Sequence, residues 1–320
     1  MKKIISILNK KKSIPLDKFI NIALYDKDFG FYMNKNPFGR KGHFITSPTI
    51  SNLFAEMIAI WCISFWSYLG KPKKILLVEL GPGDGSLCEK ILKVSKKFDD
   101  FYNCLEINLL EISDKLRSIQ KKKLKNRKVK WINKLEEINS GPIIFFGNEF
   151  FDALTIKQFY KKKNSLKEKY ITLTKDKKRL SFEYKKASTK IINSIKSYNL
   201  LVSGNVVEYP INAIKYLSAI SKKVNEYDGG LLIFDYGYIK KQNKNTLQAI
   251  KNHKFIDPFK QPGNSDITSH INFDLFIKIL NKNKLEVNKV VTQNEFLQKM
   301  GIKQRADMLS NKMSFKEKIS

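Results

Sequence analysis

The chain has 320 residues with 42% hydrophobic and 12% aromatic side chains, enough to bury a sizeable core, and no apolar run approaches the roughly 20 residues of a membrane span. The 60 basic and 30 acidic residues give a net charge of +30, which would suit nucleic-acid binding. However, 55 of the basic residues are lysines spread along the chain, whereas nucleic-acid readers rely on arginine, so we expect a solvated lysine-rich surface and no nucleic-acid partner.

The three cysteines, Cys62, Cys88 and Cys104, are widely spaced and form no C-x-x-C pair. We therefore expect neither a disulfide framework nor a metal site. The first residues, "MKKIISILNKKKSIPLDKF", lack a long apolar stretch and a small-residue cleavage site and are not Arg-rich, which argues against an export signal or a transit peptide. These features favour a bacterial cytoplasm over a mitochondrial matrix, and they leave the oligomeric state open.

In chain order, residues 1–35 are expected to be helical and then irregular, and "PFGRKGHFITSPTIS" (37–51) is a Gly/Pro loop that ends in a helix-start signature. The segment 50–69 is apolar with polar breaks, which predicts a buried core helix. From Lys73 onward, apolar runs alternate with helical patterns. Strands are predicted in "KILLVEL" (74–80), "CLEINLLEIS" (104–113), "VKWI" (129–132) and "PIIFFGNEF" (142–150).

The alternation predicts a doubly wound α/β domain. Residues 157–205 instead look like short strands joined by Lys/Asn turns, which predicts an antiparallel β insertion. The α/β alternation is expected to resume with "VVEYP" (206–210), a helix, the central strand "GGLLIFDYGY" (229–238) and a last strand in "LEVNKVVTQ" (285–293). We divide the chain into a helical N-terminal region (1–70), two core parts (71–156 and 206–320) and the insertion (157–205).

A glycine-rich turn follows the first predicted core strand. Glu79, Gly81, Gly83 and Gly85 form E-x-G-x-G-x-G, in which the glycines let the backbone approach a ligand closely. A dinucleotide enzyme would carry G-x-G-x-x-G, but Ser86 occupies the third glycine position. An acidic residue before the turn would repel a pyrophosphate, and it suits a ligand with a cationic end. The spacing therefore favours S-adenosylmethionine over a nicotinamide cofactor.

A second acidic residue, Glu111, follows the next strand, where a carboxylate can accept two hydrogen bonds from ribose hydroxyls. The alternative is a carboxylate at a helix N-terminus that needs no ligand. The glycine turn and Glu111 together indicate a methyltransferase, although either alone would be weak.

The chain also resembles the MidA-like family of S-adenosylmethionine-dependent methyltransferases, which includes a mitochondrial arginine methyltransferase that assists complex I assembly. The resemblance runs from about residue 14 to 309, and "NEFFDAL" (148–154) and "SDITSHINF" (265–273) are its most specific motifs. It implies a seven-strand core with additions at the N-terminus and after the fourth strand. It also implies symmetric dimethylation of arginine on a protein substrate, such as a respiratory complex I subunit.

Within the loop expected to cover the cofactor, Thr46, Ser47 and Pro48 fit the family pattern. The family usually has Asp where this chain has His43, and Glu where it has Thr49. These departures put the detail of the loop, and the activity, in question. We assign Thr46 and Ser47 to cofactor binding.

The segment "NEFFDAL" supplies carboxylates at the end of a strand, where a doubly wound fold places its ligands. We hypothesise that Glu149 binds the substrate guanidinium, that Asp152 helps and that Asn148 positions it. The alternative is that Asn148 and Asp152 cap a following helix. Asp235, at the end of another central strand, is expected to line the same pocket, and Asp266 and His270 match family positions, with His270 more often structural than a general base in such a setting. Asn133 is assigned to the adenine amine. His253 is expected to be structural and Phe150 and Phe151 to be core, with one of the two rings as an alternative wall against the sulfonium methyl.

Two other functions compete with this interpretation. The net charge would favour an RNA methyltransferase, but the chain lacks the Asn/Asp-Pro-Pro-aromatic turn that amino-group methylation of bases commonly uses. The His43 and Thr49 departures would favour an assembly chaperone that binds the cofactor without turnover.

Overall fold

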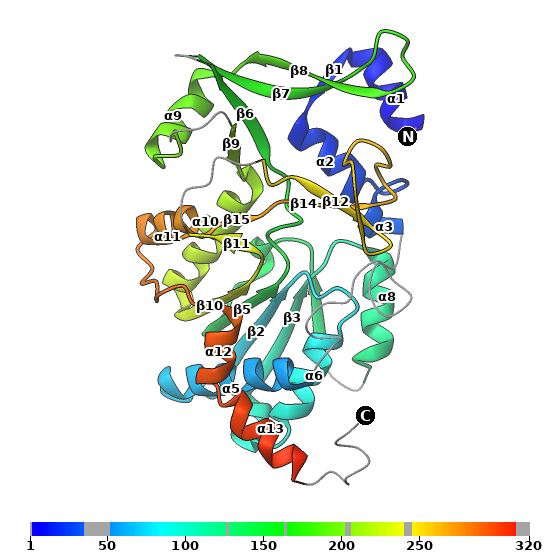
Figure 1. Ribbon diagram of the computed structural model, residues 1–320. Helices are drawn as coiled ribbons and strands as arrows, with labels where there is room; N and C mark the ends of the chain where they lie inside the picture. Colours follow the sequence, from blue (N-terminus) through cyan, green and yellow to red (C-terminus); the bar gives the residue numbers. More distant parts are fainter. Residues whose placement is uncertain are drawn as a thin grey trace.

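The computed structural model describes residues 2–34, 52–125, 128–162, 165–201, 206–239 and 245–311. Figure 1 shows a parallel sheet with its helices at one end of the molecule and an antiparallel sheet at the other. His43, Thr46, Ser47 and Thr49 lie outside the described residues, so the structure leaves the predictions for them untested.

The parallel sheet has the strand order β10-β5-β2-β3-β4. After β2 the chain adds β3 and β4 on one side and then β5 and β10 on the other, so the direction of winding reverses between β2 and β5. Ligands of open α/β sheets bind at such a reversal, beyond the carboxyl ends of the strands. The five strands are β2 (Ile75–Leu80), β3 (Leu105–Leu110), β4 (Val129–Ile132), β5 (Ile143–Asn148) and β10 (Gly229–Phe234).

Alternating side chains of these strands enter two separate cores, as the two-residue period of a strand requires. Leu77, Ile144 and Phe146 pack with α5 (Asn52–Tyr68), α6 (Ser86–Ser95) and α7 (Asp99–Cys104) on one face. Val78 and Phe145 pack with α10 (Ile211–Tyr227) and α11 (Phe273–Lys282) on the other. The predicted core helix is confirmed as α5, and no helix of the described ranges is long and apolar enough to cross a membrane.

The second sheet has the order β1-β7-β6-β9, with β8 paired to the other side of β7, and its pairs are all antiparallel. Its strands are β1 (Ser13–Pro15), β6 (Lys157–Lys162), β7 (Ser165–Leu173), β8 (Leu180–Lys186) and β9 (Val206–Tyr209). A third core joins this sheet to α1 (Lys2–Lys11) and α2 (Leu16–Tyr25), with Phe19 and Ile171 at its centre. The helix α9 (Thr189–Ser197) follows β8.

Short elements complete the described chain. They are α3 (Phe31–Asn34), α8 (Asp114–Lys123), the 3-10 helix η1 (Leu135–Glu137), β11 (Gly237–Tyr238), β12 (Gln248–Lys251), β13 (Lys254–Ile256), β14 (Asp266–Thr268), β15 (Ile271–Asn272), α12 (Gln293–Lys299) and α13 (Ile302–Ser310). Strands β12, β13 and β14 form a small sheet that lies between the two larger ones (Figure 1).

Three sequence predictions about the fold need correction. The segment "VVEYP" forms β9, which pairs with β6 in the antiparallel sheet and does not resume the parallel one. The predicted last strand at 285–293 is not a strand, because these residues run without regular structure into α12. The parallel sheet accordingly has five strands within the described ranges, not the seven that the family resemblance implied.

Candidate functional site

A cavity of about 680 Å³ lies beyond the carboxyl ends of β2, β3 and β5. Glu79 and Gly81 come from β2 and the turn after it, Glu111 follows β3, and Glu149 follows β5. The opposite wall comes from α2 and α3 and from the small β12–β14 sheet, through Tyr25, Tyr32, Gln248, Asp266 and Thr268. The cavity therefore lies where the winding of the parallel sheet reverses.

The glycine turn has the backbone that the sequence predicted. Gly81, Gly83 and Gly85 have φ values of 63°, 55° and 80°, in the left-handed region that favours glycine. A Cβ on Gly81 would stand 2.7 Å from Cδ2 of Phe150, so the turn and the ring fit together only without a side chain there. Gly81 and Gly83 line the cavity, whereas Gly85 faces Gln120 and begins α6.

Glu79 is 3% exposed, and its Oε2 has no hydrogen-bond partner among the described residues. Burial raises the pKa of this carboxyl to about 8, and Asp84 and Glu111 raise it further through charge repulsion. A buried carboxylate without a partner is costly, and a cationic ligand removes that cost. This orphaned atom fits the cationic end of S-adenosylmethionine.

Glu111 is held in a fixed position by two donors. Its Oε1 accepts a hydrogen bond from the Ser113 backbone N–H (2.8 Å), and its Oε2 accepts one from Gln120 Nε2 (3.2 Å). Burial raises its pKa against these hydrogen bonds. Gln120 also donates to the Gly83 carbonyl (2.7 Å), so it ties Glu111 to the glycine turn. The role of Gln120 could not be predicted from the sequence, because no pattern in its own helix distinguishes it as a residue of the site.

Asn148 is the last residue of β5, residues 149–154 form a turn and not a helix, and β6 follows. The alternative in which Asn148 and Asp152 cap a helix is therefore wrong. Glu149 has a φ of 52°, uncommon for a non-glycine residue, and accepts a hydrogen bond from Asn148 Nδ2 (3.3 Å). Asn148, Glu149 and Asp152 all line the cavity.

Four carboxyl groups lie close enough to affect one another, and together they form what we call the acid cluster: Glu149, Asp152, Asp235 and Asp266. Burial is the main cause of the raised pKa of each. The pKa of Asp152 rises further because of Asp235, Asp266 and Glu149, and the pKa values of Asp235 and Asp266 are each raised to about 7. Such a cluster is stabilised by a bound cation.

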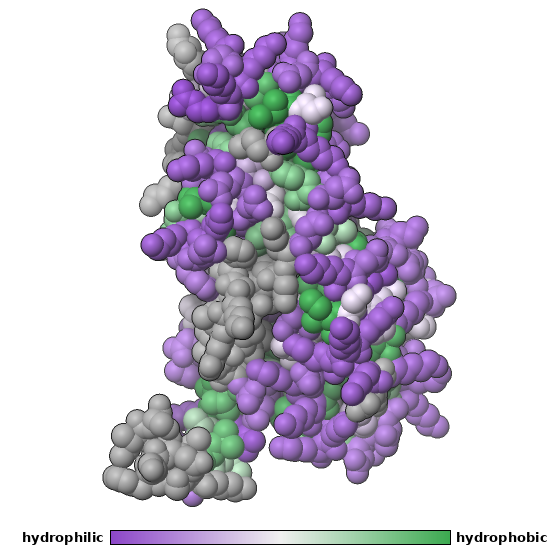
Figure 2. Space-filling model, turned by 90° about the vertical axis from the view of Figure 1, so that its right-hand side faces the viewer, coloured by the Kyte–Doolittle hydropathy of each residue, from purple (hydrophilic) through white to green (hydrophobic). Residues whose placement is uncertain are grey.

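Charge is strongly segregated between the cavity and the rest of the molecule. Among the described residues, six carboxylates line the cavity and no Lys or Arg does so, although basic residues outnumber acidic ones 60 to 30 in the chain; the six are Glu79, Asp84, Glu111, Glu149, Asp152 and Asp266. Only Asp84 has an ion-pair partner in the described part of the chain, Lys123 at 2.7 Å. Figure 2 shows an outer face dominated by hydrophilic side chains.

Other assignments fare differently. Asn133 is exposed and is not one of the cavity-lining residues of the described chain, and its Oδ1 accepts a hydrogen bond from Arg117 (3.1 Å). Its adenine contact stays a prediction. His270 lines the cavity, and His253 lies in an exposed turn with a φ of 61°. Phe151 is buried core, whereas Phe150 is a cavity wall. Tyr25, Tyr32 and Tyr236 also line the cavity and were missed.

The chain matches a known protein family over most of its length. Residues 57–291 match the family described as "Putative S-adenosyl-L-methionine-dependent methyltransferase". Because the match covers more than half of the chain, the protein belongs to this family, and the MidA-like resemblance is confirmed. It is an S-adenosylmethionine-dependent methyltransferase, and Glu79 and the glycine turn are compatible with that cofactor.

Several curated relatives are similar over nearly the whole chain. "Protein arginine methyltransferase NDUFAF7, mitochondrial" of Xenopus tropicalis is 29% identical and aligns with 94% of this chain and 75% of its own length. The homologue of Caenorhabditis elegans is 32% identical, with 86% and 69% covered. A Burkholderia thailandensis protein crystallised with S-adenosyl-homocysteine has a similar fold, with a TM-score of 0.78, 22% identity, and 96% and 80% of the two chains covered.

Proposed function

We propose that this methyltransferase modifies an arginine side chain of a protein, and that the acid cluster binds the acceptor guanidinium. The observation that carries the proposal is the lining of the cavity, to which the described part of the chain contributes six carboxylates and no Lys or Arg. A nucleic-acid acceptor would bring its phosphates toward these carboxylates. The names of the curated relatives support a protein arginine acceptor.

The cavity divides into a cofactor side and an acceptor side. On the cofactor side, Glu79 would bind the cationic end of S-adenosylmethionine and Glu111 would accept hydrogen bonds from its ribose hydroxyls, while Gly81 and Gly83 leave room for it. The bound cofactor supplies the methyl group. Phe150 packs against Gly81 and also lines the cavity.

On the acceptor side, a guanidinium presents a planar set of N–H donors that carboxylates bind bidentately. Glu149 would orient the nitrogen that receives the methyl group, with Asp152 as second acceptor and Asn148 fixing the Glu149 carboxylate. Positioning of this kind is worth roughly 7–11 kcal/mol at best. The acceptor nitrogen loses one proton for each methyl group gained, and Asp266, whose pKa is about 7, can receive it.

The test is transfer of a radiolabelled methyl group from S-adenosylmethionine to a lysate that lacks this enzyme. We expect Glu149→Gln to lose transfer and keep S-adenosyl-homocysteine affinity within about twofold, because the carboxylate is on the acceptor side. Glu106→Gln changes an exposed glutamate paired with Lys74 at 3.6 Å and serves as the matched control. Unchanged turnover in Glu149→Gln would contradict the assignment.

Amino-acid analysis of the labelled band identifies the acceptor. Symmetric dimethylarginine on a respiratory complex I subunit is the product that we propose from the family resemblance. A methylated lysine or base would overturn the arginine proposal. Cofactor binding without any labelled protein would instead favour the assembly chaperone. For the compartment, the relatives' names say mitochondrial, and for this chain we propose a bacterial cytoplasm.

A further inference from the structure

Two tyrosines from the N-terminal helices form a wall of the cavity. Tyr25, at the end of α2, and Tyr32, in α3, stack with ring centroids 5.7 Å apart and planes 21° from parallel. The Tyr25 hydroxyl donates to the carbonyl of Ala153 (2.9 Å), directly after Asp152. The pair thus reaches the acceptor side of the site from a part of the chain more than one hundred residues away.

Tyr32 touches both sides of the site. Its hydroxyl donates to Asp266 Oδ1 (2.8 Å), on the acceptor side. Its carbonyl accepts a hydrogen bond from the Ser113 hydroxyl (2.9 Å), and the N–H of the same serine donates to Glu111 (2.8 Å), on the cofactor side. One residue therefore connects the two carboxylates that we assign to the acceptor and to the cofactor.

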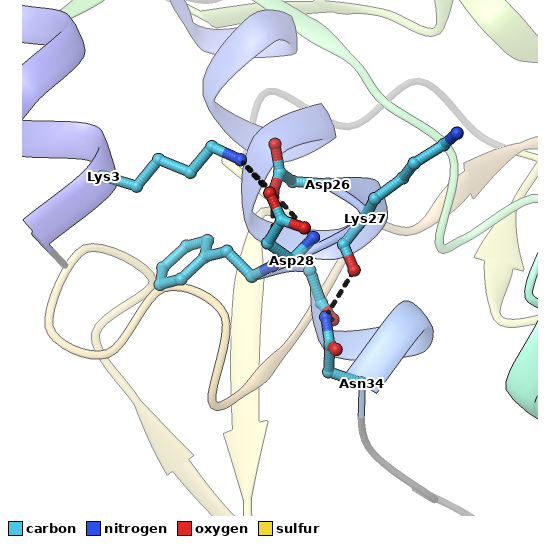
Figure 3. A network of polar contacts seen from close by, with 7 residues as sticks. Lys3, Asp26, Lys27, Asp28 and Asn34 are labelled. Carbon is cyan, nitrogen blue, oxygen red and sulfur yellow. Dashed lines mark hydrogen bonds and ion pairs between the residues drawn. The ribbon is translucent and has the colours of Figure 1, made fainter.

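The turn before α3, the helix that carries Tyr32, is itself held in place (Figure 3). Lys3 of α1 forms ion pairs with Asp26 (2.6 Å) and Asp28 (3.1 Å), and Asn34 Nδ2 donates to the Lys27 carbonyl (3.0 Å). A Cβ on Gly30 would stand 2.5 Å from the Asp26 nitrogen, so the chain can close this turn only with glycine. The position of Tyr32 is thus fixed from outside the cavity.

We propose that Tyr32 is a positioning residue for methyl transfer. Its hydroxyl orients the Asp266 carboxylate toward the acceptor cation, and its carbonyl, through Ser113, holds Glu111 in a fixed position relative to Asp266. The inference rests on the acceptor role proposed above for the acid cluster. The inference makes the N-terminal helices part of the active site, because Tyr32 belongs to α3.

The hydroxyl also affects the charge of Asp266. The carboxyl faces Glu149 and Asp152 from the turn after β5, and Tyr25 and Tyr32 from α2 and α3. Asp235 acts on the same turn through the backbone N–H groups of Phe151 and Asp152. Burial raises the pKa of Asp266 to about 7, and the hydrogen bond from Tyr32 opposes that rise. Removal of the hydroxyl should therefore raise the pKa of Asp266 further, so the ionised form that binds a cation appears only at higher pH.

The experiment measures ethylguanidinium binding to the complex with S-adenosyl-homocysteine by calorimetry between pH 6 and 9. In Tyr32→Phe, which keeps the stacked ring, we expect the midpoint of the pH–affinity curve to move up by about one pH unit. Because the lost hydrogen bond also orients the Asp266 carboxylate, ethylguanidinium affinity at pH 9 should fall slightly, and by less than at pH 7. The affinity for S-adenosyl-homocysteine should match the unmutated protein. Tyr25→Phe, which removes a hydroxyl bonded to a carbonyl, should weaken binding without moving the midpoint.

An unmoved midpoint in Tyr32→Phe would overturn the inference, and so would an equal loss of affinity at every pH. Absence of binding by either probe at any pH would also overturn it, together with the acceptor role of the acid cluster. Propylammonium, measured in parallel, separates the two proposals. If it binds better than ethylguanidinium and its midpoint still moves in Tyr32→Phe, then the arginine proposal fails while the role of Tyr32 stands.

Discussion

The carboxylate of Asp235 accepts a hydrogen bond from the backbone N–H of Asp152 (3.2 Å), and the same Oδ2 accepts one from Phe151 (3.0 Å). Asp235 lies just after β10 and Asp152 lies in the turn after β5, so the hydrogen bonds join the ends of two neighbouring parallel strands. Asp235 thus fixes the turn that presents Glu149 and Asp152 to the cavity.

Replacement of Asp235 by alanine should leave these two N–H groups unsatisfied and loosen the turn. We expect kcat/KM to fall at least tenfold, because one lost hydrogen bond to a charged group is worth about 1.5–3 kcal/mol. S-adenosyl-homocysteine affinity should hold, since Glu79 and Glu111 lie on other strands. Asp235→Asn, which keeps one acceptor oxygen, should lose less than alanine, and an equal loss in both variants would contradict an anchoring role.

The raised pKa of Glu79 predicts a pH-dependent stability. Its carboxyl has a pKa of about 8 in the folded chain against 4.5 as the reference value, so the folded state binds the proton more tightly than the unfolded state. Its contribution to stability is therefore complete below about pH 4.5 and is lost as the pH rises toward 8. Glu79→Gln carries no titrating group and escapes this loss.

We therefore expect the unfolding free energy of Glu79→Gln, relative to the unmutated protein, to rise by at most about 1.4 kcal/mol per pH unit between pH 5 and 8. Denaturant titrations of both proteins without cofactor at several pH values measure it. A constant difference would show that Glu79 keeps its ordinary pKa. The same variant should bind S-adenosylmethionine more weakly at pH 8, because it cannot offer a carboxylate to the cationic end.

Gly81→Ala tests the close approach at the glycine turn. The new Cβ would meet the Phe150 ring at 2.7 Å on a backbone with a φ of 63°, so we expect cofactor affinity to fall by about tenfold or more. Gly301→Ala is a matched control, because Gly301 has a φ of 87° and no atom nearer than 3.7 Å. It should show the backbone strain as lower stability and leave cofactor affinity unchanged. Equal affinity losses in both variants would point to general destabilisation.

Lys157 of β6 ties the antiparallel sheet to α2. It pairs with Asp17 (3.0 Å) and Glu168 (2.5 Å), and its side chain is only 13% exposed. Lys157→Met leaves two carboxylates without a cation, so unfolding free energy should fall by about 3–5 kcal/mol. Lys74→Met, which removes an exposed ion pair with Glu106, should cost about 0–1 kcal/mol. Denaturant unfolding measures both, and similar effects would contradict a structural role for Lys157.

The sequence was sufficient for the features that local rules determine. The strand, glycine turn and helix from Ile75 to Ser95 follow from a buried apolar run and from three glycines at positive φ. Glu111 could be placed because the end of a parallel strand lies at the ligand edge of the sheet. The residues on the adjoining strand ends, Glu149 and Asp152, were placed by the same rule.

Local sequence patterns could not predict the contacts between segments that are far apart in the chain. Tyr25 and Tyr32 lie in short N-terminal helices whose pattern indicates only burial, and their partners are 128 and 234 residues away. The strand β9 looks like any short buried strand, so only its pairing with β6 decides which sheet it joins. The hydrogen bond from Arg117 to the side-chain oxygen of Asn133 joins residues sixteen positions apart, and no local pattern indicates it.

The acidic lining of the cavity and the basic net charge of the chain select binding partners in different ways, one at contact and the other at long range. At long range, the net charge of +30 repels basic proteins and attracts acidic ones, and salt weakens this attraction. At contact, the carboxylates of the cavity accept only a cationic or neutral side chain. For the arginine acceptor that we propose, this arrangement of charge favours an isolated cationic side chain on an acidic protein over an arginine-rich tail.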